Sequence, residues 1–163
     1  MSPPSRGIDV ELTKTDQRSR STVGFSQTPT LYKLHWQDDS GAPDEYVHCG
    51  ADLLLNGLNR NLDADAKCPI CGTITRLLIV NGKLDGLEPR DAIIHVLEMP
   101  TKSGRIWVEC EPTHIFDKKT CFEEWVSEYK GKPGLVTSVE DYHDLLVQRR
   151  FNRQKSPEEK QKS

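Results

Sequence analysis

The chain has 163 residues, of which 35% are hydrophobic and 29% are charged, and its formal net charge is −3. This length suits one domain with a core of its own, and the small net charge gives no sign of a nucleic-acid or membrane-surface partner. No apolar run approaches the roughly 20 residues that cross a bilayer. The first six residues lack the apolar stretch of a secretory signal, so we expect a cytoplasmic protein.

The composition divides the chain into three parts. Residues 1–29 mix Ser, Thr, Arg, Pro and Gln without apolar periodicity, and we expect them to form a disordered leader. Residues 30–152 carry the periodic patterns and should form the folded domain. Residues 153–163 are charged, and we expect a disordered tail.

The first half of the domain contains a predicted strand and a predicted helix. Leu31–Trp36 alternates in part and carries two aromatic residues, which indicates a strand. A turn cluster follows at Asp38–Pro43. From Asp44 to about Asn59, apolar residues recur at spacings of three and four, which predicts a helix.

The second half contains several strands and then two helices. Thr73–Val80 is rich in β-branched residues, and Asn81-Gly82 after it is a hairpin turn signal. Strands are predicted at 92–99 and 104–111, followed by a loop through 116. Asp117 or Thr120 should cap a helix whose buried stripe is Phe122, Trp125, Val126 and Tyr129. Ser138 opens a last helix that ends near residue 151. This order predicts an α+β fold with a mainly antiparallel sheet flanked by helices.

Five cysteines carry most of the chemical interest: Cys49, Cys68, Cys71, Cys110 and Cys121. Their odd number and uneven spacing argue against a disulfide framework, and in a reducing compartment we expect thiols, metal ligands or nucleophiles.

Cys49 and Asp52 stand three residues apart, which places both side chains on one face of the predicted helix. The start of a helix lowers the pKa of a thiol and so favours the reactive thiolate. A semi-buried cysteine beside a solvated aspartate also explains this pair.

Cys68-Pro-Ile-Cys71-Gly forms a second motif, a turn in which two thiols approach each other. A closed structural zinc site needs four ligands, and the sequence contains no second Cys-x-x-Cys. Cys110 and Cys121 are the remaining thiols, and each on its own is most simply a core residue. Cys68 and Cys71 could therefore be half of a zinc site, a redox pair or two core thiols in a turn.

From about Leu31 to Phe151 the chain resembles the catalytic domain of organomercurial (alkylmercury) lyases. The resemblance rests on an ordered series of short motifs: Tyr46-Val-His-Cys49-Gly-Ala-Asp52, Cys68-Pro-Ile-Cys71-Gly72, Leu87-Glu88-Pro89, Cys110-Glu-Pro-Thr-His114-Ile-Phe116, Glu124-Trp125 and Ser138-Val139-Glu140.

The resemblance implies an alkylmercury-lyase-like single domain that cleaves carbon–mercury bonds by protonolysis to a hydrocarbon and Hg(II). The family's two mercury-binding cysteines match Cys49 and Cys110, and its proton-shuttling aspartate matches Asp52. Asp52 then needs a raised pKa, which an apolar pocket supplies. The reaction requires no cofactor. The implied partners are a small organomercurial and a thiol or mercuric-ion acceptor protein.

The sequence also departs from the family pattern. Members usually carry a winged-helix-like domain where residues 1–29 stand here, Gly50-Ala51 replaces an aromatic, and Cys110-Glu111 replaces a cysteine doublet. Cys71 is not typical of the family. The alternative function is therefore a non-catalytic module that binds zinc or another soft metal through Cys68 and Cys71, with Cys110 or Cys121 as further ligands. A third alternative is an interaction protein on a degenerate fold.

Overall fold

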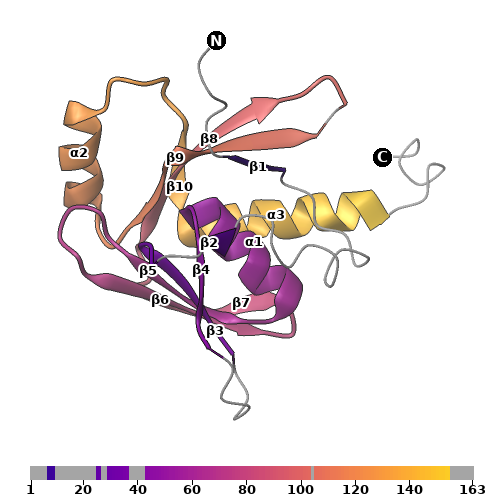
Figure 1. Ribbon diagram of the computed structural model, residues 1–163. Coiled ribbons are helices and arrows are strands. Elements are labelled where there is room, and N and C mark those ends of the chain that lie inside the picture. Colours follow the sequence, from indigo (N-terminus) through magenta and orange to yellow (C-terminus); the bar gives the residue numbers. More distant parts are fainter. Residues whose placement is uncertain (1–6, 10–24, 27–28, 37–42, 104, 155–163) are drawn as a thin grey trace.

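The computed structural model describes residues 7–9, 25–26, 29–36, 43–103 and 105–154. In this part of the chain two antiparallel sheets combine with three helices, which confirms the predicted α+β class (Figure 1). The sequence predicts one sheet, whereas the described residues form two. The strands of both sheets pair only in the antiparallel sense.

The larger sheet has six strands in the order β2-β4-β3-β5-β6-β7. Its strands are β2 (Phe25–Ser26), β3 (Tyr32–His35), β4 (Glu45–Val47), β5 (Asp63–Lys67), β6 (Ile74–Val80) and β7 (Lys83–Glu88). The β6–β7 turn is the predicted Asn81-Gly82 pair, and both residues have positive φ, 53° and 72°. Such a turn matches the twist of a hairpin.

The smaller sheet has four strands in the order β1-β9-β8-β10. Its strands are β1 (Gly7–Asp9), β8 (Ile93–Pro100), β9 (Ile106–Phe116) and β10 (Leu135–Ser138). The β8–β9 register shifts between His95 and Leu97, because His95 pairs with His114 whereas Leu97 pairs with Glu109. Four residues of β9 therefore stand opposite one residue of β8, and Cys110 is among those four. Irregularities of this kind re-aim side chains next to functional sites.

Three helices complete the fold: α1 (Gly50–Arg60), α2 (Lys119–Glu128) and α3 (Val139–Gln154). Helix α1 contacts β3 and β5 of the larger sheet and β8 and β9 of the smaller one, so it joins the two sheets. Helix α2 lies at the side of the molecule opposite the free end of α3 (Figure 1). None of the helices in the described ranges has the length and apolar character that a membrane span requires.

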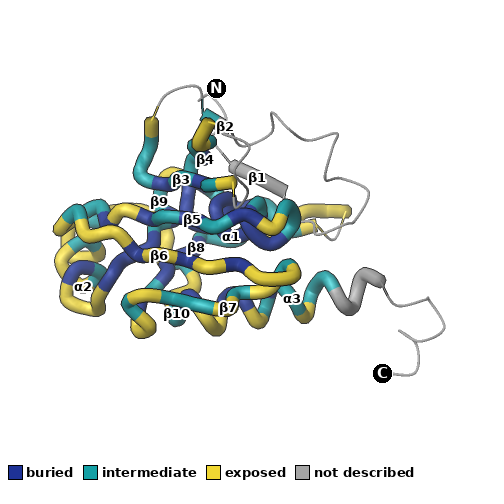
Figure 2. The backbone as a smooth tube through the Cα atoms, turned by 90° about the horizontal axis from the view of Figure 1, so that it is seen from below, coloured by how far each residue is buried: buried dark blue, intermediate teal, exposed yellow. Residues whose placement is uncertain are grey.

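The core follows from this central position of α1. Eight of its eleven residues are buried, and the tube in Figure 2 is dark blue along most of the helix, whereas α2 and α3 alternate between buried and exposed colours. The largest side chains packed in the core include Tyr32, Leu34, Leu54, Ile115 and Tyr142.

Three predicted elements differ from the structure. The helix predicted from Asp44 begins only at Gly50, since Glu45–Val47 forms strand β4. The loop predicted for residues 112–116 is the end of strand β9. Val126, predicted to be buried, is 39% exposed, and Cys121 is the residue of α2 that is buried.

The two ends of the chain are described only in part. The leader expected to be disordered contains strands β1 and β2, which pair with β9 and β4, while its other residues up to 28 lie outside the described residues. The turn predicted at residues 38–43 lies almost entirely outside them as well. At the other end α3 continues to Gln154, three residues beyond its predicted end, and 155–163 are not described. The domain boundaries at 30 and 152 remain predictions.

Candidate active site

Cys49 occupies the junction between strand β4 and helix α1. It is the residue immediately before the helix, with extended backbone angles (φ −151°, ψ 170°), and it is fully buried. Asp52 follows in the first turn of α1 and is 2% exposed. The predicted proximity of this thiol and this carboxyl at the start of a helix is therefore present, although Cys49 lies just outside the helix rather than in its first turn.

The start of α1 approaches strand β9 very closely at Gly50. A Cβ atom added to Gly50 would lie 2.8 Å from Cγ1 of Ile115. Only a residue without a side chain fits this gap unless Ile115 moves. The glycine that weakens the helical pattern of the sequence thus lets α1, and Cys49 with it, lie against β9.

Cys110 lies on β9 and faces the same buried region. It is 3% exposed, and its side chain lies close enough to that of Cys49 to raise the pKa of the Cys49 thiol. The structure therefore brings together two thiols that are separated by about 60 residues of sequence, with Asp52 beside Cys49.

The pKa of the Cys49 thiol is raised well above its usual value. Burial is the largest cause, and the interaction with the neighbouring Cys110 side chain raises the pKa further, with a contribution from the charge of Asp52. The expectation that the helix start lowers the pKa of Cys49 is wrong, because the removal of the thiol from water outweighs the backbone amides of the first turn. The resting site therefore holds Cys49 as a neutral thiol.

The carboxyl of Asp52 also favours its neutral form. Burial raises its pKa to about 8, against opposing hydrogen bonds from the His48 backbone and the Asn56 side chain. Asn56 Nδ2 donates to Oδ1 of Asp52 at 2.6 Å, whereas Oδ2 is buried with no hydrogen-bond partner among the described residues. A carboxyl in this state carries a proton at neutral pH, which agrees with the direction expected from the sequence.

Tyr32 and His114 form a second layer around the thiols. The Tyr32 hydroxyl lies 2.6 Å from Nδ1 of His114, and charges on Cys49, Cys68 and Cys110 all raise the pKa of Tyr32 in addition to the dominant effect of burial. Burial lowers the pKa of His114 to about 4. Both side chains are therefore neutral at pH 7, so neither supplies a positive charge that would favour ionisation of the thiols.

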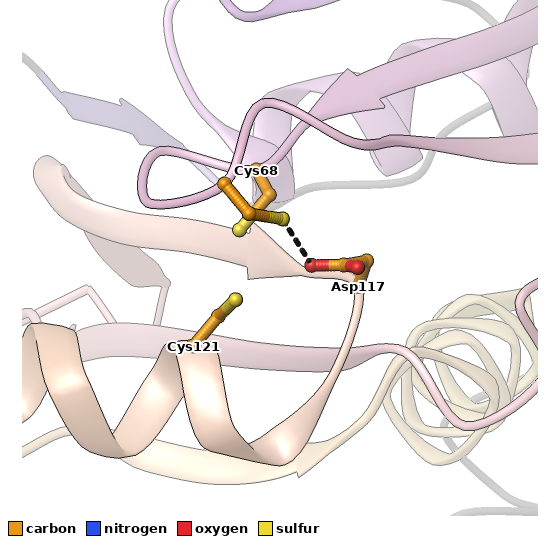
Figure 3. A group of neighbouring side chains, drawn as sticks. Cys68, Asp117 and Cys121 are labelled. Carbon is orange, nitrogen blue, oxygen red and sulfur yellow. Dashed lines mark hydrogen bonds between the residues drawn. The ribbon is translucent and has the colours of Figure 1, made fainter.

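The two other predicted thiols lie in a separate group. Cys68 and Cys71 meet Asp117 and Cys121, and the ligand atoms of these four residues all lie within 4.8 Å of one another (Figure 3). From the sequence, Cys121 is a candidate further ligand beside Cys68 and Cys71, whereas Asp117 is predicted to cap a helix. In the structure Lys118 precedes the first residue of α2, and Asp117 instead accepts a hydrogen bond of 3.0 Å from Cys71.

A cavity of about 650 Å³ lies next to the site without including its thiols. Its lining includes Ile70, Glu111, His114, Trp125 and Tyr129. Cys110 and Glu111 are neighbours on one strand, so their side chains point to opposite faces, which explains why the cavity reaches Glu111 but not Cys110. His114 is shared between the cavity lining and the layer around Cys49 and Cys110.

The chemistry of the buried group is that of a soft metal site with a proton source. Thiols prefer soft ions such as Hg(II) over hard ones. A carboxyl that is protonated at neutral pH can donate its proton to a basic atom held beside the thiols.

Comparisons with known proteins point to one family. The family model described as "MerB: Alkylmercury lyase" matches residues 25–148. An alkylmercury lyase of Bacillus cereus is 26% identical over 102 residues, which cover 61% of this chain and 46% of that protein. An alkylmercury lyase of Streptomyces lividans is 25% identical over 120 residues, which cover 72% of this chain and 54% of that protein.

A solved structure described as the mercury-bound form of MerB2 has a similar fold. It superimposes with a TM-score of 0.58 at 21% sequence identity, covering 79% of this chain and 62% of the other. The chain spans about half the length of the curated relatives it matches. Because the family model covers about three-quarters of its residues, the chain belongs to the alkylmercury lyase family.

Proposed function

We propose that the protein is an organomercurial lyase that cleaves carbon–mercury bonds by protonolysis, with Cys49 and Cys110 as the mercury-binding thiols and Asp52 as the proton shuttle. The observation that carries this proposal is the pair of buried thiols of Cys49 and Cys110, which the fold brings together from the start of α1 and from β9, with the raised pKa of Asp52 beside them. Membership of the alkylmercury lyase family supports it.

Binding of the substrate exchanges thiol protons for mercury. One thiol first displaces X from an organomercurial R–Hg–X, so that a sulfur–mercury bond replaces the Hg–X bond and X leaves with the thiol proton as HX. The second thiol then coordinates the same mercury atom and keeps its proton at this stage, although binding to the soft metal makes that proton easier to remove. This exchange overcomes the raised pKa of Cys49, which otherwise keeps the thiol protonated.

Asp52 then supplies the proton that cleaves the carbon–mercury bond. Two sulfur ligands push electron density onto mercury and make the bound carbon more basic. The Asp52 carboxyl donates its proton to that carbon, the electron pair of the carbon–mercury bond forms the new carbon–hydrogen bond, and Asp52 recovers a proton from the second thiol. The products are R–H, HX and Hg(II) on two thiolates, without any change of oxidation state.

The proposal includes a cellular setting. All five cysteines are free thiols, a state that the reducing cytoplasm maintains. The reaction as written needs only the substrate and the protein's own side chains, and a small thiol or a mercuric-ion acceptor protein then removes Hg(II). The alternative of a non-catalytic zinc or soft-metal module gains no support from the comparisons, because the matching relatives are named as lyases.

Release of benzene from phenylmercury in the presence of excess thiol tests the proposal. The parent protein should release benzene catalytically, and Cys49→Ala, Cys110→Ala and Asp52→Ala should each abolish this release. Asp141→Ala is a matched control, since Asp141 is an exposed carboxylate in the first turn of α3, and it should retain the parent rate. Benzene release by Asp52→Ala at the parent rate would overturn the assigned proton shuttle, and its absence from the parent would overturn the lyase.

A further inference from the structure

We propose that Cys68, Cys71, Asp117 and Cys121 hold a structural Zn²⁺ that is separate from the mercury-binding thiols. Figure 3 shows Cys121 pointing from the first turn of α2 toward Cys68 and Asp117, which lie across from it. The four residues come from two distant parts of the chain, the β5–β6 turn and the β9–α2 junction.

The distances are close to those of a tetrahedral zinc site. Zinc–sulfur bonds of about 2.3 Å and zinc–oxygen bonds of about 2.1 Å place the ligand atoms of a tetrahedron about 3.5–3.8 Å apart. All four ligand atoms here lie within 4.8 Å of one another, and the Cys71 sulfur is already 3.0 Å from Oδ1 of Asp117. Shifts of about 1 Å or less convert this group into a zinc site.

The backbone around Cys68 and Cys71 is already shaped for a shared ion. The amide of Gly72 donates to the Cys68 carbonyl at 3.0 Å, and the amide of Cys68 donates to the Thr73 carbonyl at 2.9 Å. Gly72 has a φ of 77°, which residues with a side chain rarely adopt. These bonds close the turn independently of a metal, so the two cysteines are preorganised as neighbouring ligands.

The ligand types identify the ion and its role. Three sulfur ligands and one carboxylate oxygen are a donor set that tetrahedral Zn²⁺ accepts, and four protein ligands leave no position open for a substrate. Cys68 and Cys121 are 2% and 4% exposed and Asp117 is 8% exposed, whereas Cys71 lies at the exposed side of the group. A closed and largely buried set of this kind indicates a structural site rather than a catalytic one.

The location explains what such an ion stabilises. Cys68, Phe116 and Cys121 form a small core of their own, with Phe122 and Trp125 packed against it, apart from the main core around α1. A core of this size supplies little stabilisation on its own, and a metal ion compensates for this in small domains. The zinc would link the β5–β6 turn to α2 and fix both walls of the cavity, since Ile70 and Trp125 both line it.

Metal analysis of the reduced, full-length protein tests this proposal without any organomercurial, so its result is independent of the lyase assay. The purified parent should contain close to one zinc per chain, and Cys68→Ser and Cys121→Ser should lose it. Cys49→Ser and Cys110→Ser are the matched controls, because they remove buried thiols outside the four residues, and they should keep the zinc. Asp117→Asn should weaken zinc binding about tenfold or more in a chelator competition.

Cobalt substitution provides a second measurement that does not depend on the folding of the cysteine variants. The parent protein loaded with Co²⁺ should show the absorption of a tetrahedral ion and intense sulfur-to-cobalt charge transfer, and Asp117→Asn should alter the tetrahedral bands. A parent that binds neither zinc nor cobalt in reducing buffer overturns the proposal. Loss of zinc in Cys49→Ser or Cys110→Ser together with its retention in Cys121→Ser overturns it equally.

Discussion

Asn56 donates a hydrogen bond of 2.6 Å to Oδ1 of Asp52, while Oδ2 of the same carboxyl is buried and has no hydrogen-bond partner among the described residues. One oxygen is thus held in place, and the other is free to carry the proton that the proposed reaction needs. Burial raises the pKa of the carboxyl to about 8, and the bond from Asn56 opposes this rise because it favours the charged form.

We predict that the rate of benzene release falls above about pH 8, where Asp52 loses its proton. Asn56→Ala removes a hydrogen bond to the carboxylate, so the alkaline limb should move to higher pH by about one unit. Asn59→Ala, on the same helix, should leave the limb where it is. A limb that stays in place or moves to lower pH in Asn56→Ala would contradict the role given to Asp52.

The raised pKa of Asp52 has a consequence for stability. The unfolded chain ionises this carboxyl near pH 3.8 and the folded chain only near pH 8, so the folded state binds one more proton between these values. The free energy of unfolding therefore falls as the pH rises from about 4 to about 8, and at pH 7 the loss is at most on the order of 4 kcal/mol.

Asp52→Asn should remove this loss and make the protein more stable at pH 7 while it abolishes benzene release. Urea unfolding at pH 7 and at pH 4 measures the difference, and the gain should largely disappear at pH 4, where Asp52 is neutral in the folded parent. An equal gain at both pH values, or a loss at pH 7, would show that the carboxyl does not carry a raised pKa.

Gly50 sets the distance between α1 and β9. In an ordinary helix Gly→Ala stabilises by about 1 kcal/mol, but here the new Cβ would lie 2.8 Å from Cγ1 of Ile115. We predict that Gly50→Ala destabilises the protein by about 1–2 kcal/mol and slows benzene release, because Cys49 moves with the start of the helix.

Ile115→Ala removes the colliding atoms and serves as the second arm of a double-mutant cycle. In that background Gly50→Ala should cost less than it does in the parent. Urea unfolding measures both costs. If they are equal, the destabilisation by Gly50→Ala does not come from the contact with Ile115.

Tyr32 is held by His114, and its hydroxyl is buried. Tyr32→Phe leaves the Nδ1 atom of His114 without this partner, and the expected destabilisation is about 1–3 kcal/mol. In a His114→Phe background the same change should cost clearly less, because the bond is already absent. A cost in the parent below about 0.5 kcal/mol would mean that the 2.6 Å contact contributes little.

The sequence predicts best where local chemistry decides the structure. The β-branched residues of Ile74–Val80 and the Asn81-Gly82 turn specify the β6–β7 hairpin, and the Ser138 hydroxyl accepts a hydrogen bond from the Asp141 amide at the start of α3, as its capping pattern indicates. These features depend on neighbours within a few residues, so one stretch of sequence contains the whole signal.

Other strands cannot be predicted from their own residues, because pairing with neighbouring strands is what makes them form. Strand β5, Asp-Ala-Asp-Ala-Lys, has no large apolar residue and forms because β3 and β6 pair with both of its edges. The residues of strand β4 instead predict the start of a helix, because Val47 lies four residues before Ala51. The end of β9 after Pro112 exists because β8 pairs with it beyond a shift of register.

The candidate site shows the same division. The Cys-x-x-Asp pair of Cys49 and Asp52 and the Cys-x-x-Cys turn of Cys68 and Cys71 are visible as short spacings. The meeting of Cys49 with Cys110 is proposed from family resemblance, and only the tertiary structure shows it. Asp117 gives no sequence signal as a ligand, because an aspartate before a helix is far more often a cap.

The location of mercury after one turnover tests the central claim most directly. Crystals of the protein reacted with one equivalent of phenylmercury, with benzene release confirmed in solution, allow mercury to be located by its anomalous scattering. We predict a single strong peak between the sulfur atoms of Cys49 and Cys110, bonded to both, with the Asp52 carboxyl beside it. Mercury bound only at Cys68, Cys71 and Cys121, or on Cys49 without Cys110, would contradict the account.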